Sequence, residues 1–328
     1  MKTYLSGIQP SGLLHLGNYF GAIGQHIALQ QRPGRHFYFI ADLHALTTVR
    51  DPEALRRNVF ETAATYLSLG LDPQKSVLWR QSDVPEVTEI AWLLSTVTGM
   101  GLLERAHSFK DKTARGISAS VGLFTYPVLM AADILAYDAD FVPVGQDQVQ
   151  HVEMAQDMAG SYNAVYGEGV LKRPECLLPE AGAAKKVPGL DGQKMSKSYG
   201  NDIWIFESGK ALKKRVGQIV TDSRPPEEPK DPEGLFLFEL LALFLEAGEL
   251  ADWKVKVRRG GPGAPGYGHL KARLAEAMEA WFAPARARRE ELIANPDRVA
   301  SVLADGAGRA REQARDVRDR CYRACGLC

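Results

Sequence analysis

The chain has 328 residues, and its 40 basic and 40 acidic side chains cancel to a formal net charge of zero. A chain of this length usually exceeds one compact hydrophobic core, so we expect two domains. The composition, 45% hydrophobic and 24% charged, is typical of a globular protein and excludes extensive disorder. Because the net charge is zero, any polyanion must be held by a local basic patch. The opening MKTYLSGIQP lacks a secretory signal and no stretch is apolar enough for a membrane span, so we expect a cytoplasmic protein with no membrane partner.

The first part of the chain predicts strands that alternate with helices. TYLSGI (residues 3–8) alternates as a strand, and the turn residues QPSG separate it from a helix that begins near Gly17. HFYFI (36–40) predicts a second strand, and DPEALRRNVFETAATYLSLG (51–70) predicts a helix with Asp51 as its N-cap and Pro52 at its first position. SVLWRQS (76–82) predicts a third strand. This order predicts an α/β fold, a Rossmann-like parallel sheet whose ligands bind beyond the carboxyl ends of the strands.

From about Leu235 onward the pattern predicts helices only. They are LFLFELLALFLEAGEL (235–250), HLKARLAEAMEAWFAPARARREELIANP (269–296) and a final Arg-rich stretch. The segments RPPEEPKDPEG and RRGGPGAPGYG predict loops between them. We therefore expect a catalytic domain at 1–190 and a smaller, all-helical domain at 191–328 that includes a lysine-rich loop, with the join between 189 and 201.

The first motif with chemical potential is PSGLLHLGN (10–18), which lies on the turn between the first strand and its helix. Free N–H groups at a helix N-terminus attract phosphate, and Gly17 allows the backbone to approach a ligand closely. His15 and Asn18 can donate hydrogen bonds to phosphate oxygens. The alternative is a turn with a surface histidine, and the motif alone does not decide between them.

The second motif is KMSKS (194–198), which is flanked by glycines in a polar loop. Lys194 and Lys197 can clamp a polyphosphate if the loop closes, and the glycines supply the mobility for closure. The alternative is an ordinary solvated loop. A His-x-Gly-Asn turn followed by KMSKS resembles the two signatures of the class I aminoacyl-tRNA synthetases, and the combination is far more specific than either motif.

The segment TYPVLMAADIL (125–135) contains a carboxylate among apolar residues. Tyr126, Met130 and Asp133 are spaced i, i+4, i+7, so on a helix beginning at Pro127 the last two share a face and Tyr126 lies just before it. A buried Asp133 needs a partner, which an indole N–H could supply. The alternative is a capping or salt-bridged aspartate in a structural helix.

This segment resembles the amino-acid-binding helix of the tryptophanyl and tyrosyl synthetases. The tyrosyl branch typically has Gln at the middle position, whereas Met130 suits a large aromatic ring and favours tryptophan. The resemblance to the tryptophanyl branch extends over nearly the whole chain: SGIQPSG (6–12), GNY (17–19), ADLHA (41–45), FKDK (109–112), VPVGQDQ (142–148) with Gln150 and His151, TDS (221–223), and Tyr267, Gly268 and Lys271.

The resemblance implies two substrate sites. Asp133 would accept the indole N–H, and the other tryptophan-binding residues would be Gly7, His44, Tyr126, Met130, Val142, Val144 and Gln148. The ATP site would comprise Gln9, Pro10, Ser11, Gly17, Asn18, Gly145, Gln146, Asp147, Val187, Lys194, Met195, Ser196, Lys197 and Ser198. The catalytic residues would be His15, Asn18, Lys112, Lys194 and Lys197. No protein-held metal is implied, and Mg²⁺ would be bound mainly by ATP.

Two residues depart from the family pattern, and one cysteine pattern stays unassigned. Leu5 stands where an aromatic residue is common beside the indole, and Ser108 stands where Gln is usual. Both could loosen selectivity toward modified indoles. Cys321, Cys325 and Cys328 have the spacing of an iron–sulfur ligand set, but nothing nearby resembles the loop that houses such a cluster, so we expect no metal there.

The resemblance implies a homodimer that activates L-tryptophan with ATP and transfers it to tRNA(Trp). Arg286, Arg288, Arg289 and the arginines between 309 and 323 could offer a basic surface to the tRNA, or could simply be solvated. Three other functions remain open: a tyrosyl synthetase, a dehydrogenase on a similar sheet, and a paralogue without activity. Met130 opposes the first, the lack of a Gly-x-Gly-x-x-Gly loop at the first strand–helix turn opposes the second, and the intact motifs oppose the third.

Overall fold

The computed structural model describes residues 1–106, 120–178 and 187–327. The chain forms two compact units, and neither unit is continuous in sequence. Unit 1 comprises residues 1–12, 25–181 and 292–328, and unit 2 comprises 13–24 and 182–291. These units interleave along the chain, unlike two domains that meet once, and the functional division into 1–190 and 191–328 stays a prediction.

Unit 1 contains a parallel sheet of five strands in the order β3-β2-β1-β4-β5. The strands are β1 (Thr3–Ile8), β2 (Arg35–Ile40), β3 (Ser76–Arg80), β4 (Phe141–Pro143) and β5 (Glu175–Leu177). The strand order reverses between β1 and β4, and such a switch point is where doubly wound sheets bind their ligands. The predicted α/β class and the first three strands are confirmed. β4 and β5 have three residues each, too few to produce a periodic signal in the sequence.

Alternate residues of the strands point to opposite faces of the sheet. On one face, the hydroxyl of Tyr38 donates to the carbonyl of His26 on α2 (Gly24–Leu29), and the His26 ring bonds the hydroxyl of Tyr66 on α4 (Pro52–Ser68). On the other face, Phe37 and Trp79 belong to a core built with α5 (Glu86–Ser95), α8 (Val121–Leu135) and α9 (Val149–Tyr166). As predicted, Asp51 caps α4, accepting from the backbone N–H of Glu53 at 3.0 Å.

Helix α8 begins earlier than the sequence suggested. Its N-cap is Ser120, whose hydroxyl accepts from the N–H of Leu123 at 3.2 Å, and Pro127 lies inside the helix instead of starting it. The hydroxyl of Ser120 caps the helix and stabilises a start before the proline. The helix therefore tolerates Pro127, although proline removes one backbone hydrogen bond from it. Tyr126 is therefore part of α8, on the same face as Met130 and Asp133.

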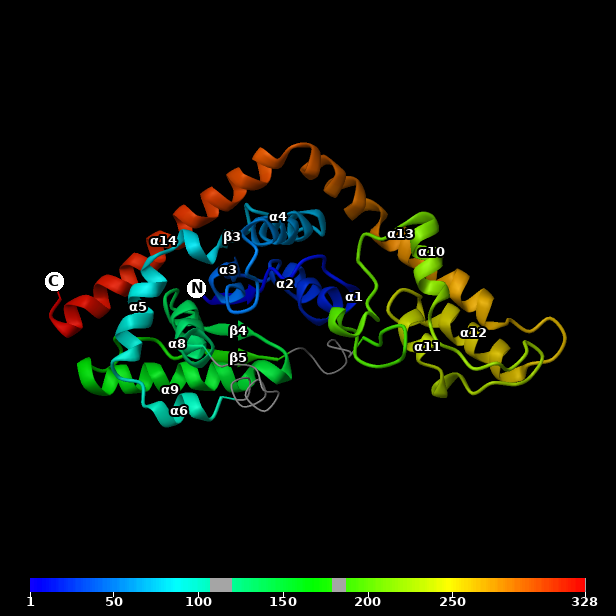
Figure 1. Cartoon of the computed structure of the whole chain (residues 1–328), viewed down its shortest axis with the longest axis horizontal. Helices are drawn as coiled ribbons and strands as arrows, with labels where there is room; N and C mark the ends of the chain where they lie inside the picture. Colours follow the sequence, from blue (N-terminus) through cyan, green and yellow to red (C-terminus); the bar gives the residue numbers. More distant parts are fainter. Residues whose placement is uncertain (107–119, 179–186, 328) are drawn as a thin grey trace. The chain divides into compact units, whose positions relative to one another are not determined.

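The last helix of the chain, α14 (Pro296–Cys325), belongs to unit 1, and Figure 1 shows it beside β3 and α5. It packs along the edge strand β3 and against α5. Its small and apolar residues Ala310, Ala314, Val317 and Cys321 are fully buried in the core of this unit. Among the described residues, unit 1 also contains α3 (Asp42–Ala45), η2 (Gln81–Asp83), α6 (Met100–Glu104) and η3 (Gln146–Gln148).

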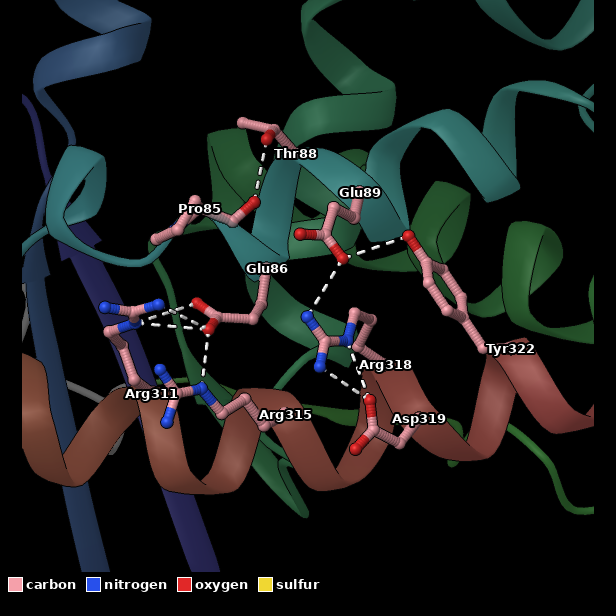
Figure 2. Close-up of polar contacts among 9 residues, drawn as sticks. All are labelled: Pro85, Glu86, Thr88, Glu89, Arg311, Arg315, Arg318, Asp319 and Tyr322. Atoms are coloured by element: carbon pink, nitrogen blue, oxygen red, sulfur yellow. Dashed lines mark hydrogen bonds and ion pairs between the residues drawn. The ribbon is translucent and has the colours of Figure 1, made fainter. Parts of the chain in front are cut away.

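The arginines of α14 are engaged within unit 1. Arg311 and Arg315 bind the carboxylate of Glu86, and Arg318 binds Glu89 (Figure 2). Arg320 binds Asp138, with a nitrogen–oxygen distance of 2.6 Å. These arginines thus pair with carboxylates of unit 1, and the hypothesis that the stretch offers a basic surface to the tRNA stays a prediction.

Unit 2 is mainly helical. Its elements are α1 (Leu16–Asn18), the π-helical turn η1 (Tyr19–Ile23), η4 (Lys197–Tyr199), α10 (Gly209–Gly217), η5 (Pro232–Gly234), α11 (Phe236–Leu241), α12 (Ala247–Arg259) and most of α13 (Tyr267–Ala294). The single helix expected at 235–250 is wrong. The chain tightens after Leu241, where the N–H of Phe244 bonds the carbonyl of Leu241 in an i to i−3 pattern, and a new helix starts at Ala247.

Two further expectations concern loops and membranes. The Pro/Gly-rich loop between α12 and α13 is confirmed, and Gly260, Gly261 and Gly263 in it have positive φ angles of 60°, 84° and 78°. Within the described residues, none of the helices combines the length and the apolar character needed to span a bilayer.

Candidate active site

Three buried polar side chains meet at the carboxyl ends of β2 and β3. Asp133 on α8 accepts from the side-chain amide of Gln81, with distances of 2.9 and 2.8 Å to its two carboxylate oxygens. Nε2 of His44 on α3 lies 3.0 Å from Oδ2 of the same carboxylate. Asp133 and Gln81 are each only 1% exposed. These residues come from three separate elements, so the sheet brings together what the sequence keeps far apart.

Burial raises the pKa of Asp133, although hydrogen bonds from His44 and Gln81 oppose the rise. The carboxylate is nevertheless well supplied with donors. A carboxylate offers about four lone-pair positions, so it keeps capacity for one more donor from a ligand. The structure thus places a buried hydrogen-bond acceptor on the helix that also carries Met130.

The side chain of Gln81 also holds the backbone at His44 in place. Its side-chain oxygen accepts from the backbone N–H groups of Leu43 at 3.1 Å and His44 at 3.3 Å, while its amide nitrogen holds Asp133. The neighbouring Ser82 donates from its N–H to Oδ1 of Asp42 at 2.9 Å. Gln81 was not among the predicted site residues. Its position directly after a strand was the available signal, because ligand-facing residues gather there.

The predicted tryptophan-binding residues of unit 1 lie on the elements around this cluster. Tyr126 and Met130 share the face of α8 that carries Asp133, and the Tyr126 hydroxyl lies 3.1 Å from Nε2 of His151. Val142 is buried in β4, and the half-buried Val144 follows it. Gly7 in β1 packs against Phe39, since an added Cβ would stand 2.4 Å from the Phe39 ring.

The predicted ATP-binding residues of unit 1 follow β1 and β4, at the switch point of the sheet. After β1, the N–H of Ser11 bonds the carbonyl of Gln9 at 2.9 Å in a tight turn, with Pro10 buried between them. After β4, the N–H of Gln148 bonds the carbonyl of Gly145 at 2.9 Å. Gln146 is exposed in that turn. Lys112 and Ser108 lie outside the described residues, as does the side chain of Asp147.

In unit 2, the backbone of the His-x-Gly-Asn turn is hydrogen-bonded to the segment that follows the KMSKS loop. The N–H of Leu16 donates to the carbonyl of Ile203 at 3.0 Å, and the N–H of Ile205 donates to that of Leu14 at 3.1 Å. Asn18 Oδ1 accepts from the N–H of His15 at 2.9 Å and fixes the turn. Gly17 faces the second motif, because a Cβ there would lie 3.6 Å from Cβ of Met195.

The KMSKS residues lie on a hairpin. The N–H of Met195 bonds the carbonyl of Val187 at 3.0 Å, and Pro188 pairs with Lys194 in an antiparallel bridge. Met195 is buried at 3% exposure, whereas Lys194 and Ser198 are exposed. The hydroxyl of Ser196 accepts from the N–H of Ser198 at 3.3 Å and caps the short turn η4.

Asn201 secures this hairpin and was also missed by the sequence analysis. Its side-chain oxygen accepts from the N–H of Ser196 at 2.8 Å, and its amide nitrogen donates to the Asp191 carboxylate at 2.7 Å and to the Lys194 carbonyl at 3.3 Å. The side chain is buried, so these bonds are shielded from water. Asn201 thus fixes the backbone on both sides of Met195.

The two motifs also interact electrostatically within unit 2. Burial lowers the pKa of His15, the positive charge of Lys197 lowers it further, and Asp202 opposes both effects. Burial likewise lowers the pKa of Lys197. His15 is therefore mainly neutral at pH 7, so it would offer an anion at this position a neutral hydrogen-bonding imidazole.

Of the three C-terminal cysteines with the spacing of an iron–sulfur ligand set, Cys321 is fully buried in α14. Burial raises the pKa of its thiol to about 11. Cys328 lies outside the described residues. In the described part of the chain, no group of three or more His, Cys, Asp or Glu side chains is arranged to hold a metal ion.

A Rossmann-type sheet together with a His-x-Gly-Asn turn and a KMSKS hairpin defines a class I aminoacyl-tRNA synthetase. Residues 1–283 match the family model described as "tRNA synthetases class I (W and Y)". The chain belongs to this family.

Individual relatives cover nearly the whole chain. A protein from Rhodopirellula baltica named tryptophan–tRNA ligase is 57% identical over 323 residues, which cover 98% of this chain and 99% of that protein. A protein of the same name from Campylobacter jejuni is 50% identical with the same coverage. The crystal structure of the Campylobacter jejuni tryptophanyl-tRNA synthetase with ADP and tryptophan is 49% identical and superposes with a TM-score of 0.91 over 99% of both chains.

Proposed function

We propose that this chain ligates tryptophan to tRNA(Trp) in two steps. In the first, a carboxylate oxygen of tryptophan attacks the α-phosphorus of ATP, and the bond to pyrophosphate breaks as the new oxygen–phosphorus bond forms. In the second, the terminal ribose hydroxyl of the tRNA attacks the activated carbonyl carbon and AMP leaves. A carboxylate is already a nucleophile at neutral pH, so the first step needs positioning and charge stabilisation instead of a general base.

The observation that carries the choice of tryptophan is the buried cluster of Asp133, His44 and Gln81. Its acceptor oxygens suit an indole N–H, which can only donate. Met130, on the same helix face, offers a polarizable apolar surface to an aromatic ring. The full-length relatives named tryptophan–tRNA ligase support the same choice.

The HLGN turn and the KMSKS hairpin are the parts that we propose for the phosphates. The side chains of His15 and Asn18 would donate hydrogen bonds to phosphate oxygens, and Lys194 and Lys197 would bind the departing pyrophosphate. Mg²⁺ would be held mainly by the phosphates of ATP, as is usual for this ion. Gln9, Gly145 and their neighbours at the switch point of the sheet would bind the nucleoside.

We also propose a homodimer located in the cytoplasm. Three apolar side chains of unit 1 support a partner surface: Trp92 on α5 is 71% exposed, Met100 on α6 is 62% exposed and Val121 at the start of α8 is 79% exposed. Large apolar side chains exposed on a protein surface can belong to an interface. Sedimentation of the wild type and of Trp92→Asp tests this proposal, since a dimer should weaken in the variant and a monomeric wild type would contradict it.

Exchange of labelled pyrophosphate into ATP tests the function. We expect exchange with tryptophan and none with tyrosine. In Asp133→Asn, an amide donor replaces one acceptor oxygen, so the KM for tryptophan should rise about tenfold or more. Asp157→Asn, the same chemical change at an exposed aspartate of α9, is the matched control. Exchange driven by tyrosine would move the chain to the tyrosyl branch, and no exchange with either amino acid would favour an inactive paralogue.

A further inference from the structure

Helix α14 contacts the chain on both sides of the turn that carries Gln81. Before the turn, Gly306 of α14 lies directly on β3, where a Cβ would stand 2.0 Å from the carbonyl oxygen of Leu78. After the turn, Arg311 and Arg315 of α14 bind Glu86, the first residue of α5. The segment between Leu78 and Glu86 is therefore held at each end by the same helix.

The ion pair with Glu86 is buried on the glutamate side. Glu86 is 1% exposed, and Nη2 of Arg311 and Nε of Arg315 each lie 2.9 Å from its Oε1 (Figure 2). Burial alone would raise the pKa of Glu86, but hydrogen bonds from the two arginines outweigh it and lower the pKa. Glu86 is thus ionised in the folded protein, and losing its charge removes two charge-assisted contacts.

The backbone between Gln81 and Glu86 has little room to move. The N–H of Val84 bonds the carbonyl of Gln81 at 3.1 Å, and the N–H of Val87 bonds that of Val84 at 3.2 Å. Val84 and Val87 are fully buried. A shift at Glu86 is therefore transmitted to Gln81, because close-packed interiors pass on displacements instead of absorbing them. Gln81 in turn holds both the Asp133 carboxylate and the backbone N–H of His44.

We propose that α14 is a positioning element for the amino-acid site, acting through Glu86 on the side-chain amide of Gln81. Gln81 is the positioning residue that orients the acceptor group of Asp133. The final helix of the chain thereby sets the affinity for the amino acid without touching it. This inference rests on the proposed function for the identity of the substrate.

Two carboxylates of α5 provide a matched pair of variants. Glu86→Gln removes the charge that Arg311 and Arg315 bind, next to the Gln81 turn. Glu89→Gln makes the same change at the ion pair with Arg318, one turn further along the same pair of helices (Figure 2). We expect Glu86→Gln to raise the KM for tryptophan by about tenfold while the KM for ATP stays within about twofold. Glu89→Gln should leave both values within about twofold.

If Glu86→Gln does not fold, a second variant tests the same contact from the side of α14. Arg315 is 51% exposed and makes one hydrogen bond to Glu86, while Arg311 keeps its own. Arg315→Gln should therefore fold and raise the KM for tryptophan by roughly threefold. Arg315→Lys, which keeps the charge, should restore most of the loss.

Hydrogen exchange separates this inference from the proposed function. The amides of Leu43 and His44 are bonded to Gln81, so their exchange should speed up in Glu86→Gln or Arg315→Gln but not in Glu89→Gln. The positioning role would be overturned if hydrogen exchange at Leu43 and His44 did not change in these variants. It would also be overturned if Glu86→Gln and Glu89→Gln changed the KM for tryptophan equally. If the wild type shows no exchange of pyrophosphate with tryptophan, the proposed function fails, and the amide measurement still decides whether α14 positions Gln81.

Discussion

Gly306 on α14 packs directly against the backbone of Leu78 on β3, so closely that a single added methyl group would stand 2.0 Å from the Leu78 carbonyl oxygen. No side chain can yield at this point, because the neighbour is backbone. The contact explains how a long helix can lie against the edge of a parallel sheet. It also protects an edge strand, which would otherwise expose unpaired backbone groups.

Gly306→Ala should destabilise the protein by about 1–3 kcal/mol, since α14 must move away from β3 to accommodate the methyl group. Gly308→Ala is the control in the same helix, because nothing lies within 4 Å of its added Cβ. That variant should gain up to about 1 kcal/mol from better helix propensity. Urea unfolding followed by circular dichroism measures both. Equal effects at the two positions would show that the close approach is not maintained in solution.

Asp140 should make stability depend on acid pH. The carboxylate accepts from the N–H of Thr3 at 2.8 Å and pairs with Lys2 and Lys172 at 3.0 Å each. Burial favours a higher pKa, but the hydrogen bonds from Thr3, Lys172 and Lys2 outweigh it and lower the pKa of Asp140 to about 2. An unfolded aspartate has a pKa near 3.9, so this stabilisation is complete above about pH 4 and is lost as the pH falls toward 2.

Asp140→Asn should therefore be less stable than the wild type by on the order of 2 kcal/mol at pH 7. Because the asparagine does not titrate, the difference should shrink below about pH 4 and nearly vanish by about pH 2. Urea midpoints of both proteins across this range give the measurement. A difference that stays constant down to pH 2 would mean that the Asp140 carboxylate is not the group that titrates.

Lys230 is a buried ammonium that organises a loop of unit 2. It is 2% exposed, and its Nζ donates to the carbonyls of Pro225 at 2.6 Å and Glu228 at 2.8 Å. Lys230→Met keeps the apolar stem but leaves these carbonyls without their donor, so we expect a loss of about 2–4 kcal/mol. Lys254→Met removes a more exposed pair with Glu233 and should cost less than about 1 kcal/mol. Thermal unfolding of both variants checks the ranking, and equal losses would contradict it.

Asn201 should affect the rate of activation more than substrate binding. Asn201→Ala frees the backbone at Lys194 and Ser196, and displacing a catalytic loop by about 1 Å can reduce a rate by about a hundredfold. We expect kcat for pyrophosphate exchange to fall by about 10- to 100-fold, with the KM for tryptophan nearly unchanged. Asn201→Asp keeps the acceptor for Ser196 and should fall in between. A rise in KM alone would assign Asn201 to ground-state binding.

Local signals in the sequence were sufficient for much of unit 1. Asp51 followed by Pro52 marked the start of α4, and alternating apolar residues marked β1. Such signals reside within a few neighbouring residues, so they can be read without knowing the partner. The start of α8 was misplaced because a capping serine and an internal proline gave conflicting signals, and only the packed helix decided between them.

The candidate site was predictable only in part. Some of its residues stand out among their sequence neighbours, whereas others are recognised only through contacts with distant residues. Asp133 stood out as a carboxylate among apolar neighbours. Its partner Gln81 is 52 positions away, and an unremarkable glutamine after a strand carries no sign of that contact. The arginines of α14 likewise resembled a solvated or RNA-binding face, since the carboxylates that bind them belong to a distant helix.

The discontinuity of unit 1 has a consequence for how the chain folds. Glu86 and Arg311 are 225 positions apart, so the helix that covers β3 and secures α5 is synthesised long after both. Until then β3 is an uncovered strand edge, open to pairing with another chain. Closing so long a loop is slow, and the intermediate is exposed to aggregation meanwhile. Nascent chains interrupted before α14 should therefore depend on chaperones far more than the completed chain does.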